Sequence, residues 1–302
     1  MYDILMRAGC FVGIILLGYF LKTLGLFRAN DFSVLSNIVL KITLPAAIIT
    51  NFANKQLDSS MFTLTILAIL FGAVYVAVGF LLNIRSSKDQ KAFEILNLPG
   101  YNIGCFALPF VQSFLGPTGV IATCLFDIGN GFICLGGAFS IASIVKNGQK
   151  FSFKRIVRTL MKSIPFILYI IMPILCLTHV KIPVFITSFA GIIANANAFM
   201  AMLMLGVGFN FTANKTHIGK IIRVISVRFG IAALLAVFSY FMLPFDAEVR
   251  KTLVLLVFSP IGSAVPAFTG EMKSDVGLSS AINSVSIICS VVCMVILLVI
   301  IP

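Results

Sequence analysis

The 302-residue chain is apolar and basic: hydrophobic residues fill 60% of its positions, charged residues only 11%, and the formal net charge is +12. Soluble domains carry roughly a quarter charged residues, so this composition excludes an ordinary water-soluble domain. Apolar runs long enough to cross a membrane recur from end to end. The sequence therefore predicts an all-α polytopic membrane protein.

Ten apolar runs are long enough to cross a hydrocarbon layer of about 30 Å at about 1.5 Å per residue. The first is interpreted as a span and not as a cleaved signal peptide, because it is too long for one and lacks a small-residue cleavage site. In chain order the predicted spans are Ala8 to Phe27, Phe32 to Phe52, Met61 to Ile84, Ala92 to Leu115, Thr118 to Val145, Ser163 to Val180, Pro183 to Phe211, Ile218 to Leu243, Val249 to Gly270 and Val276 to Ile301.

Basic residues are distributed unevenly between the two sides that this topology defines. Of the 22 Lys and Arg residues, 15 fall on one side, five on the other and two within spans. The side rich in Lys and Arg is cytoplasmic in most membrane proteins. The sequence therefore predicts a cell-membrane protein with both termini outside the cytoplasm and a basic cytoplasmic linker at 146–162. The same bias explains the net charge without nucleic acid as a partner.

Two segments share a pattern 158 residues apart: Asn102-Ile103-Gly104 followed by Pro109, and Pro260-Ile261-Gly262 followed by Pro266. Applied to the first, third and fifth spans, the same offset predicts starts close to those of the sixth, eighth and tenth. The chain thus divides into five spans at 1–145, the linker, and five spans at 163–302. Because five is odd, the second copy enters the membrane from the opposite side, which is the inverted repeat of many secondary transporters.

Proline and glycine interrupt the fourth and ninth spans deep inside apolar runs, where lipid cannot replace the lost backbone hydrogen bonds. Such backbone must be buried in protein or line a wet cavity. If both helices break at the same depth they cross there, and the N–H groups that begin the half-helices present partial positive charge to an anion. The alternative is a pair of ordinary kinked helices, since both residue types are common in membrane helices.

Several short stretches resemble the auxin efflux carrier family. They are Leu17-Gly18-Tyr19, Gly25-Leu26-Phe27, Leu44-Pro45-Ala46, Asn102 through Pro109, and Met204 through Phe211. The resemblance implies the ten-span, five-plus-five fold of the bile acid symporter superfamily, in which crossed spans four and nine hold the substrate between a scaffold and a moving core. It also implies a small organic acid as substrate, since the bacterial members are associated with malate, malonate and related acids.

The sequence departs from the plant exporters of that family at two points. Those exporters carry Asn-Pro-Asn near the crossover, whereas Asn102 is followed here by Ile103. They also have a long cytoplasmic loop in the middle of the chain, in place of the short basic linker. Auxin itself is therefore not implied as the substrate.

Residues around the two interrupted spans are the candidate substrate site, because they combine freed backbone groups with neutral hydrogen-bonding side chains. They are Asn102, Gly104, Pro109, Ser259, Pro260, Gly262, Ser263, Pro266 and Asn283.

A second group carries charge within the membrane, where an ionisable residue is a functional candidate because its burial is costly. Asp127 is the only acid deep in a span, and Asn130 shares its helix face at i, i+3. Asp127 is interpreted as a structural partner of Lys41 or Arg228, as a proton- or cation-coupling group, or as a substrate contact. Lys41 and Arg228 are in turn candidates for contacting an anion or for snorkelling towards the cytoplasm.

No enzyme or metal site is evident in the sequence. An HExxH or GxSxG motif is absent, the two histidines are isolated, and the seven cysteines include no CxxC pair. No cofactor is predicted. The six tyrosines are expected to act as interfacial anchors in a chain that has no tryptophan.

The sequence therefore favours a secondary active transporter that moves a small organic anion, most simply a carboxylate, by alternating access. A channel and a sensor built on a transporter-like fold are the alternatives. The substrate, the direction of transport, a coupling proton or sodium ion, and a homodimeric assembly remain open.

Overall fold

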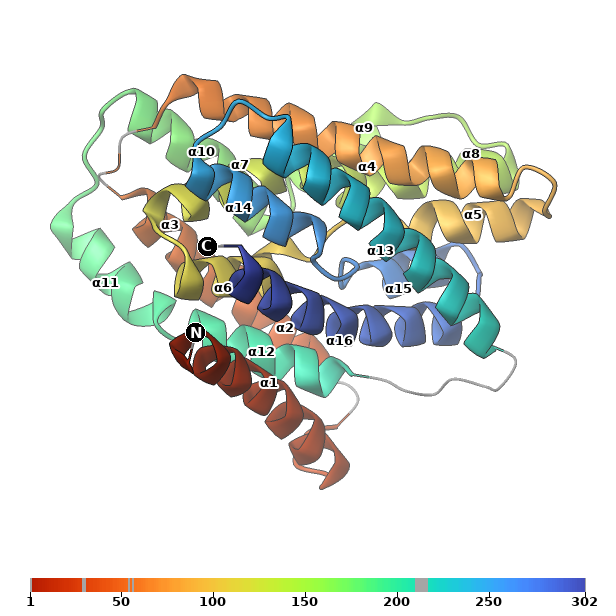
Figure 1. The fold of residues 1–302 in the computed structure, drawn as a ribbon, viewed down its shortest axis with the longest axis horizontal. Coiled ribbons are helices and arrows are strands. Elements are labelled where there is room, and N and C mark those ends of the chain that lie inside the picture. The colour runs from red at the N-terminus through yellow and green to blue at the C-terminus, as the bar shows by residue number, and fades with distance from the viewer. Residues whose placement is uncertain (1, 29–30, 54, 56, 210–216, 302) are drawn as a thin grey trace.

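The computed structural model describes residues 2–28, 31–53, 55, 57–209 and 217–301, and the described part of the chain is helical without any strand. Figure 1 shows long helices running side by side across the molecule. The elements are α1 (Tyr2–Thr23), α2 (Asp31–Ile38), η1 (Val39–Thr43), α3 (Leu44–Phe52), η2 (Ser59–Phe62), α4 (Thr63–Leu82), α5 (Lys88–Asn97), η3 (Ile103–Ala107), α6 (Leu108–Phe114), α7 (Pro117–Phe132), η4 (Ile133–Gly137), α8 (Ala138–Asn147), α9 (Phe153–Leu160), α10 (Ile164–Leu177), α11 (Val184–Ala194), α12 (Asn197–Gly208), α13 (Ile218–Phe241), α14 (Ala247–Val257), α15 (Val265–Glu271) and α16 (Val276–Ile300).

Seven helical segments among the described residues are long and apolar enough to cross a membrane, or eight if α9 and α10 form one bent span. They coincide with seven of the ten predicted spans, and the sixth predicted span contains α10. The predicted end of the seventh span at Phe211 lies outside the described residues. The seven segments are Tyr2–Thr23, Asp31–Phe52, Ser59–Leu82, Pro117–Asn147, Val184–Gly208, Ile218–Phe241 and Val276–Ile300.

The fourth and ninth predicted spans are the ones that do not form single helices. Five residues separate α5 from η3, and Gly100 among them adopts a positive φ of 80°, a conformation that favours glycine. The segment 258–264 separates α14 from α15, and Pro260 lies within it. We refer to residues 98–102 as the first break and to residues 258–264 as the second break. Helix length therefore accounts for seven or eight of the ten predicted spans.

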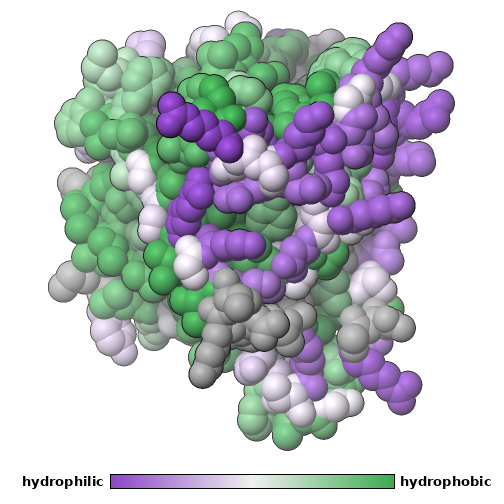
Figure 2. All heavy atoms as spheres, turned by 90° about the vertical axis from the view of Figure 1, so that its right-hand side faces the viewer, coloured by the Kyte–Doolittle hydropathy of each residue, from purple (hydrophilic) through white to green (hydrophobic). Residues whose placement is uncertain are grey.

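Loops that alternate along the chain gather at two ends of the molecule. At one end, Lys146 in the last turn of α8 forms an ion pair of 2.8 Å with Asp89 and a hydrogen bond of 3.2 Å with Ser274. At the other end, Arg7 donates to the carbonyl oxygen of Ser113, at 2.8 Å. Figure 2 shows hydrophilic side chains concentrated on the first of these ends, which we call the basic end.

The flanks between the two ends are apolar. Large hydrophobic side chains are exposed along α1, α4, α11 and α13, as expected for helices that face lipid rather than water. The centre of the fold is formed by η3, α6, α7 and α14, whose apolar side chains are almost entirely buried. Close approach of α1 and α12 depends on Gly18 and Gly206, because a Cβ on Gly18 would lie 2.5 Å from the carbonyl oxygen of Leu203.

Candidate functional site

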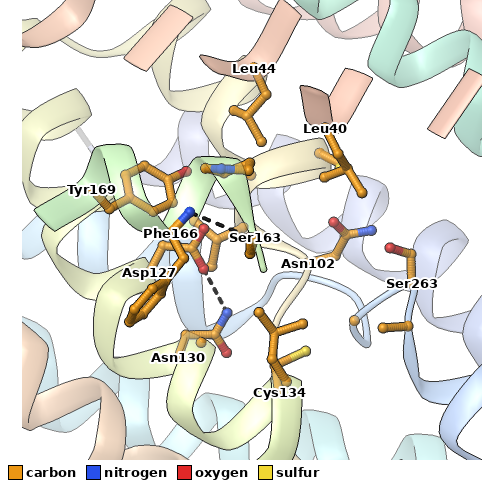
Figure 3. Close-up of a pocket in the computed structure, with 18 of the residues that line it drawn as sticks. Leu40, Leu44, Asn102, Asp127, Asn130, Cys134, Ser163, Phe166, Tyr169 and Ser263 are labelled. Carbon is orange, nitrogen blue, oxygen red and sulfur yellow. Dashed lines mark hydrogen bonds between the residues drawn. The ribbon is translucent and has the colours of Figure 1, made fainter. Parts of the chain in front are cut away.

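A pocket of about 330 Å³ lies where both breaks meet the C-terminal part of α7. One wall is formed by residues of the first and second breaks, η3, and the junction of α7 with η4. The opposite wall comes from α2, η1 and the start of α10. Figure 3 shows Asn102, Asp127, Asn130 and Ser263 around this space, with Tyr169 facing them from α10.

Three π-helical turns converge on this pocket. Lys41 of η1, Gly104 and Cys105 of η3, and Cys134 of η4 all line it. A π-helical turn is an uncommon local widening of an α-helix that occurs frequently at functional sites. Two of the three turns immediately precede a Leu-Pro pair, and proline cannot donate the backbone hydrogen bond that a regular α-helix requires.

The structure brings seven of the thirteen predicted site residues to the pocket and leaves six behind its wall. The lining residues are Asn102, Gly104, Gly262, Ser263, Asp127, Asn130 and Lys41. The others are Pro109, Ser259, Pro260, Pro266, Asn283 and Arg228, which are part of the two broken helices or pack against them.

Asn102 joins the two breaks through its backbone. Its N–H donates to the carbonyl oxygen of Pro260, at 2.9 Å. Its side-chain Nδ2 atom is buried and makes no hydrogen bond with the described residues, while the side chain itself lines the pocket. A buried amide donor without a partner is costly, so this atom is suited to bind a ligand.

Gly104 keeps the pocket open at the beginning of the outer half-helix. A Cβ at this position would lie 2.8 Å from Leu44 Cδ2, 3.5 Å from the Tyr169 hydroxyl and 3.6 Å from Asp127 Oδ2. The N–H groups in the first turn of η3 have no acceptor within their own helix, and they form the positive end of its dipole. The space that glycine leaves is therefore bordered by backbone donors and by two side-chain oxygens.

The side-chain amide of Asn130 forms hydrogen bonds within the fold through both its oxygen and its nitrogen. Its Oδ1 accepts from the N–H of Tyr101, at 2.9 Å, and its Nδ2 donates to the carbonyl oxygen of Tyr101, at 2.8 Å. The same Nδ2 lies 2.8 Å from Oδ1 of Asp127. Asn130 thus replaces the helical hydrogen bonds that the first break loses, and it positions Asp127 at the pocket.

Asn283 performs the corresponding task for the second break. From α16 its Nδ2 donates to the carbonyl oxygens of Ile261 and Gly262, at 3.0 and 3.2 Å. Ser286, one turn further along, accepts the N–H of Ile261 at 3.1 Å. Asn283 therefore lies behind the pocket wall as a support for backbone that does line the pocket.

Arg228 is buried, with 1% of its surface exposed, and it binds both breaks. Its guanidinium group donates to the carbonyl oxygens of Leu98 and Gly100 in the first break and of Ser259 in the second, the last at 2.8 Å. The rings of Tyr75 and Tyr101, which contact each other, lie beside it, with centroids 5.4 and 5.3 Å from Cζ. A cation at these carbonyls compensates the negative C-terminal ends of α5 and α14.

Asp127 forms no ion pair with Lys41 or Arg228 among the described residues. Arg228 is occupied by carbonyl oxygens, and Lys41 lies on the opposite wall with its side chain exposed. The interpretation of Asp127 as a structural partner of either residue is therefore not supported by the geometry. Asp127 is the only acidic side chain that lines the pocket in the described part of the chain.

Sequence reasoning missed Tyr169, Cys134 and the residues at the start of α10. Tyr75, Tyr101 and Tyr169 are almost fully buried, so the interpretation of the tyrosines as interfacial anchors is wrong for these three. A tyrosine in the interior of an apolar span is a signal that could have identified Tyr169, because a buried hydroxyl needs a partner. Nothing in the sequence marks Cys134, which is brought to the pocket by η4.

Comparison with known proteins agrees with this picture. Residues 10–152 match the model of a family described as membrane transport protein. An uncharacterized transporter of Methanothermobacter thermautotrophicus is 23% identical over 283 residues, which cover 92% of this chain and 91% of the relative. The resemblance that the short motifs indicated is confirmed over the first half of the chain, and both findings indicate a transporter.

Proposed function

Since the chain is a transmembrane transporter that resembles the auxin efflux carrier family, we propose that it is a secondary active carrier for a small organic anion, most simply a carboxylate. The proposal includes ten spans in a five-plus-five inverted repeat with crossed fourth and ninth helices. It also includes alternating access to one site at the crossing.

Contact between the two breaks supports the inverted repeat. The two residues that the 158-residue offset pairs, Asn102 and Pro260, are joined by a backbone hydrogen bond of 2.9 Å. Proline lies in the first turn of the α-helix that comes after each break: Pro109 in α6, which follows η3, and Pro266 in α15. In this proposal the seven long segments, the bent α9 and α10 pair and the two broken helices are the ten crossings.

Alternating access requires a site between two bodies that move relative to each other. The pocket is suited to that position, because both breaks, η3 and the junction of α7 with η4 form one wall, and α2, η1 and the start of α10 form the other. Exposed Lys162, two residues before the start of α10, is part of the lining, so the pocket reaches the basic end. A substrate bound there contacts both walls at once.

Anion chemistry is supported most directly by the free donors around the pocket. The unpaired Asn102 amide, the N-terminal backbone groups of η3, and the ammonium groups of Lys41 and Lys162 are all donors. Against them stands the single carboxylate of Asp127. This excess of donors is the observation that carries the proposal, because it favours a carboxylate over a cationic or apolar substrate.

The test begins with binding to the purified protein. A panel of mono- and dicarboxylates, with matched amines and neutral analogues, is screened for an increase in the unfolding temperature. A ligand present at 100 times its dissociation constant stabilises the native state by about 2.7 kcal/mol, which is readily measured. Stabilisation by amines alone, or by no carboxylate, contradicts the anion assignment.

Counterflow of the identified anion in proteoliposomes then separates a carrier from the alternatives. Saturable exchange of labelled for unlabelled substrate is expected of a carrier. Unitary currents in a planar bilayer indicate a channel, and binding without exchange indicates a sensor.

Asn102→Leu locates the site. It removes the unpaired donor at similar volume, so we expect at least a tenfold loss of anion affinity, corresponding to about 1.4 kcal/mol or more. Asn51→Leu is the matched control, since the Nδ2 of Asn51 is also buried without a partner but lies outside the pocket. Normal anion binding by Asn102→Leu, or equal losses in both variants, would show that the site lies elsewhere.

A further inference from the structure

The short helix α9 lies nearly at a right angle to the span that follows it. The angle between Phe153–Leu160 and Ile164–Leu177 is 82°. Because α10 is an apolar helix that begins a predicted span, α9 extends close to the plane of the membrane at the basic end. Its position is therefore that of an interfacial helix.

The inner face of α9 is anchored to the body of the protein. Ile156 and Leu160 are buried, and a Cβ on Gly136 of η4 would lie 3.1 Å from the side chain of Ile156. Arg155 forms an ion pair of 2.9 Å with Glu271 at the end of α15 and lies over the ring of Phe139. These contacts fix which face of α9 points away from the protein.

The outward face carries two stripes. Phe153, Val157 and Met161 follow each other at intervals of four residues and are 61, 36 and 53% exposed. A parallel stripe of Lys154 and Arg158 is also exposed. Residues spaced by four lie on one side of a helix, so each stripe is continuous.

Neither stripe has a partner within the described part of the chain. A surface that combines the two stripes is not typical of a helix that faces water. A solvent-facing helix would not expose a phenylalanine, a valine and a methionine in one row. Apolar residues beside a row of lysine and arginine are typical of helices that rest between lipid tails and anionic headgroups. No acidic residue occurs between Lys146 and Lys162, so the charge of this segment is complemented from outside it.

We propose that α9 is a docking surface for anionic phospholipid headgroups, in which Lys154 and Arg158 bind the phosphates while Phe153, Val157 and Met161 enter the acyl region. The basic stripe would lie at the level of the headgroups and the apolar stripe at the level of the acyl chains. Because Thr159 on the same helix lines the pocket, this docking also holds one wall of the pocket. Nothing in this proposal depends on the identity of the transported substrate.

The absence of tryptophan from the chain provides a direct test. In Phe153→Trp the introduced indole is the only one, and its fluorescence reports the lipids in contact with α9. The variant is reconstituted into mixed bilayers of phosphatidylcholine and phosphatidylglycerol at one fixed ratio. Only the phosphatidylglycerol is brominated in one preparation and only the phosphatidylcholine in the other.

Enrichment of the anionic lipid around α9 predicts that, per mole of brominated lipid, phosphatidylglycerol quenches at least about twofold more than phosphatidylcholine. The preference should fall as salt is raised. It should disappear when Lys154→Gln and Arg158→Gln are added, and persist when Arg85→Gln and Lys88→Gln are added. The latter pair is also exposed at the same end but lies outside α9.

Two results would overturn the proposal. Equal and strong quenching by both lipids would show that α9 enters the bilayer by its apolar stripe without selecting anionic headgroups. Weak quenching by both would show that the helix faces water or another protein. Each variant is required to elute as a single species before it is measured, and the Arg85 and Lys88 pair shows whether charge removal by itself disturbs the reconstituted protein.

Discussion

The polar residues inside this protein form two groups. Some use their hydrogen-bonding groups within the fold, and others keep hydrogen-bonding groups that have no partner in the fold. The side chains of Arg228, Asn130 and Asn283 form hydrogen bonds with backbone atoms of the two breaks. Asn102 and Asp127 retain capacity towards the pocket, because the first has an unpaired amide and the second accepts from Asn130 through one oxygen. The division follows from counting donors and acceptors, since each buried polar atom must be satisfied by protein, water or ligand.

Asp127 is the residue on which ion coupling would depend. Moving one negative charge inward against about 100 mV costs about 2.3 kcal/mol, so concentrative uptake of an anion needs a compensating cation. We predict that Asp127→Asn abolishes accumulation driven by an imposed proton gradient and preserves substrate exchange, because the isosteric amide keeps the shape of the site and cannot take up a proton. Labelled-anion uptake into proteoliposomes measures both quantities.

The control for this variant is Asp89→Asn, which changes an acid that is ion-paired to Lys146 and lies outside the pocket. It should accumulate substrate like the wild type. Continued gradient-driven accumulation by Asp127→Asn would exclude proton coupling through this carboxyl group.

At the scale of the helices, the important feature is that two interrupted segments are held together without forming regular structure. Arg228 of α13 reaches carbonyl oxygens in both breaks, and Asn102 contacts Pro260 directly. Behind them, Ser279 of α16 donates to Asn97 of α5 at 2.6 Å, and Asn97 donates to Thr269 of α15 at 3.3 Å. The inner halves of the two broken spans, α5 and α15, are thus tied together by polar contacts that lipid could not provide.

Arg228→Lys tests whether this tie depends on the forked guanidinium. Lysine keeps the charge but cannot reach three carbonyl oxygens in the same planar geometry. Since a hydrogen bond to a charged group contributes about 1.5–3 kcal/mol, loss of at least one should lower the apparent unfolding temperature clearly. The measurement is thermal unfolding of the purified protein, followed by the fraction that remains monodisperse.

Arg223→Lys makes the same change on the same helix, at a side chain that is 41% exposed and binds Glu94 at 3.5 Å. It should change the unfolding temperature little, because exposed ion pairs contribute about 0–1 kcal/mol. If the two variants are equally stable, Arg228 does not hold the breaks together as the geometry indicates.

For the whole molecule, charge distribution and loop position agree on one axis. The basic end carries the loops after α4, α8 and α15, and the opposite end carries those after α6 and α13. Helices between them expose apolar surface, which places the membrane across the middle. The basic end is expected to face the cytoplasm.

A labelling experiment checks this orientation in intact cells. Cysteine replaces Gln149 at the basic end or Asp246 at the opposite end, and both positions are exposed. A membrane-impermeant maleimide should label Asp246→Cys from outside and Gln149→Cys only after permeabilisation. The unmodified protein provides the background, since its own cysteines are free thiols. Labelling of Gln149→Cys in intact cells would invert the orientation.

Much of the fold was predictable because the bilayer is a simple solvent. Uninterrupted apolar runs become spanning helices, and proline or glycine within such a run must break it, whatever the neighbouring helices do. The two breaks, the location of Asn102 and Gly104, and the depth of Asp127 follow from these local constraints. The ten-span repeat is still a proposal, since helix length by itself supports seven or eight crossings.

Which polar groups face the pocket was decided only by tertiary structure. Sequence spacing placed Arg228, Asn130 and Asn283 near the site but could not show that each is consumed by backbone carbonyl or amide groups of another segment. Tyr169 reaches the pocket because α10 packs across from the breaks, and Cys134 because η4 packs against them. Such packing depends on contacts between residues far apart in the chain. The local sequence pattern therefore determines where the helices run and where they are interrupted. The long-range contacts determine which side chains remain free to bind a substrate.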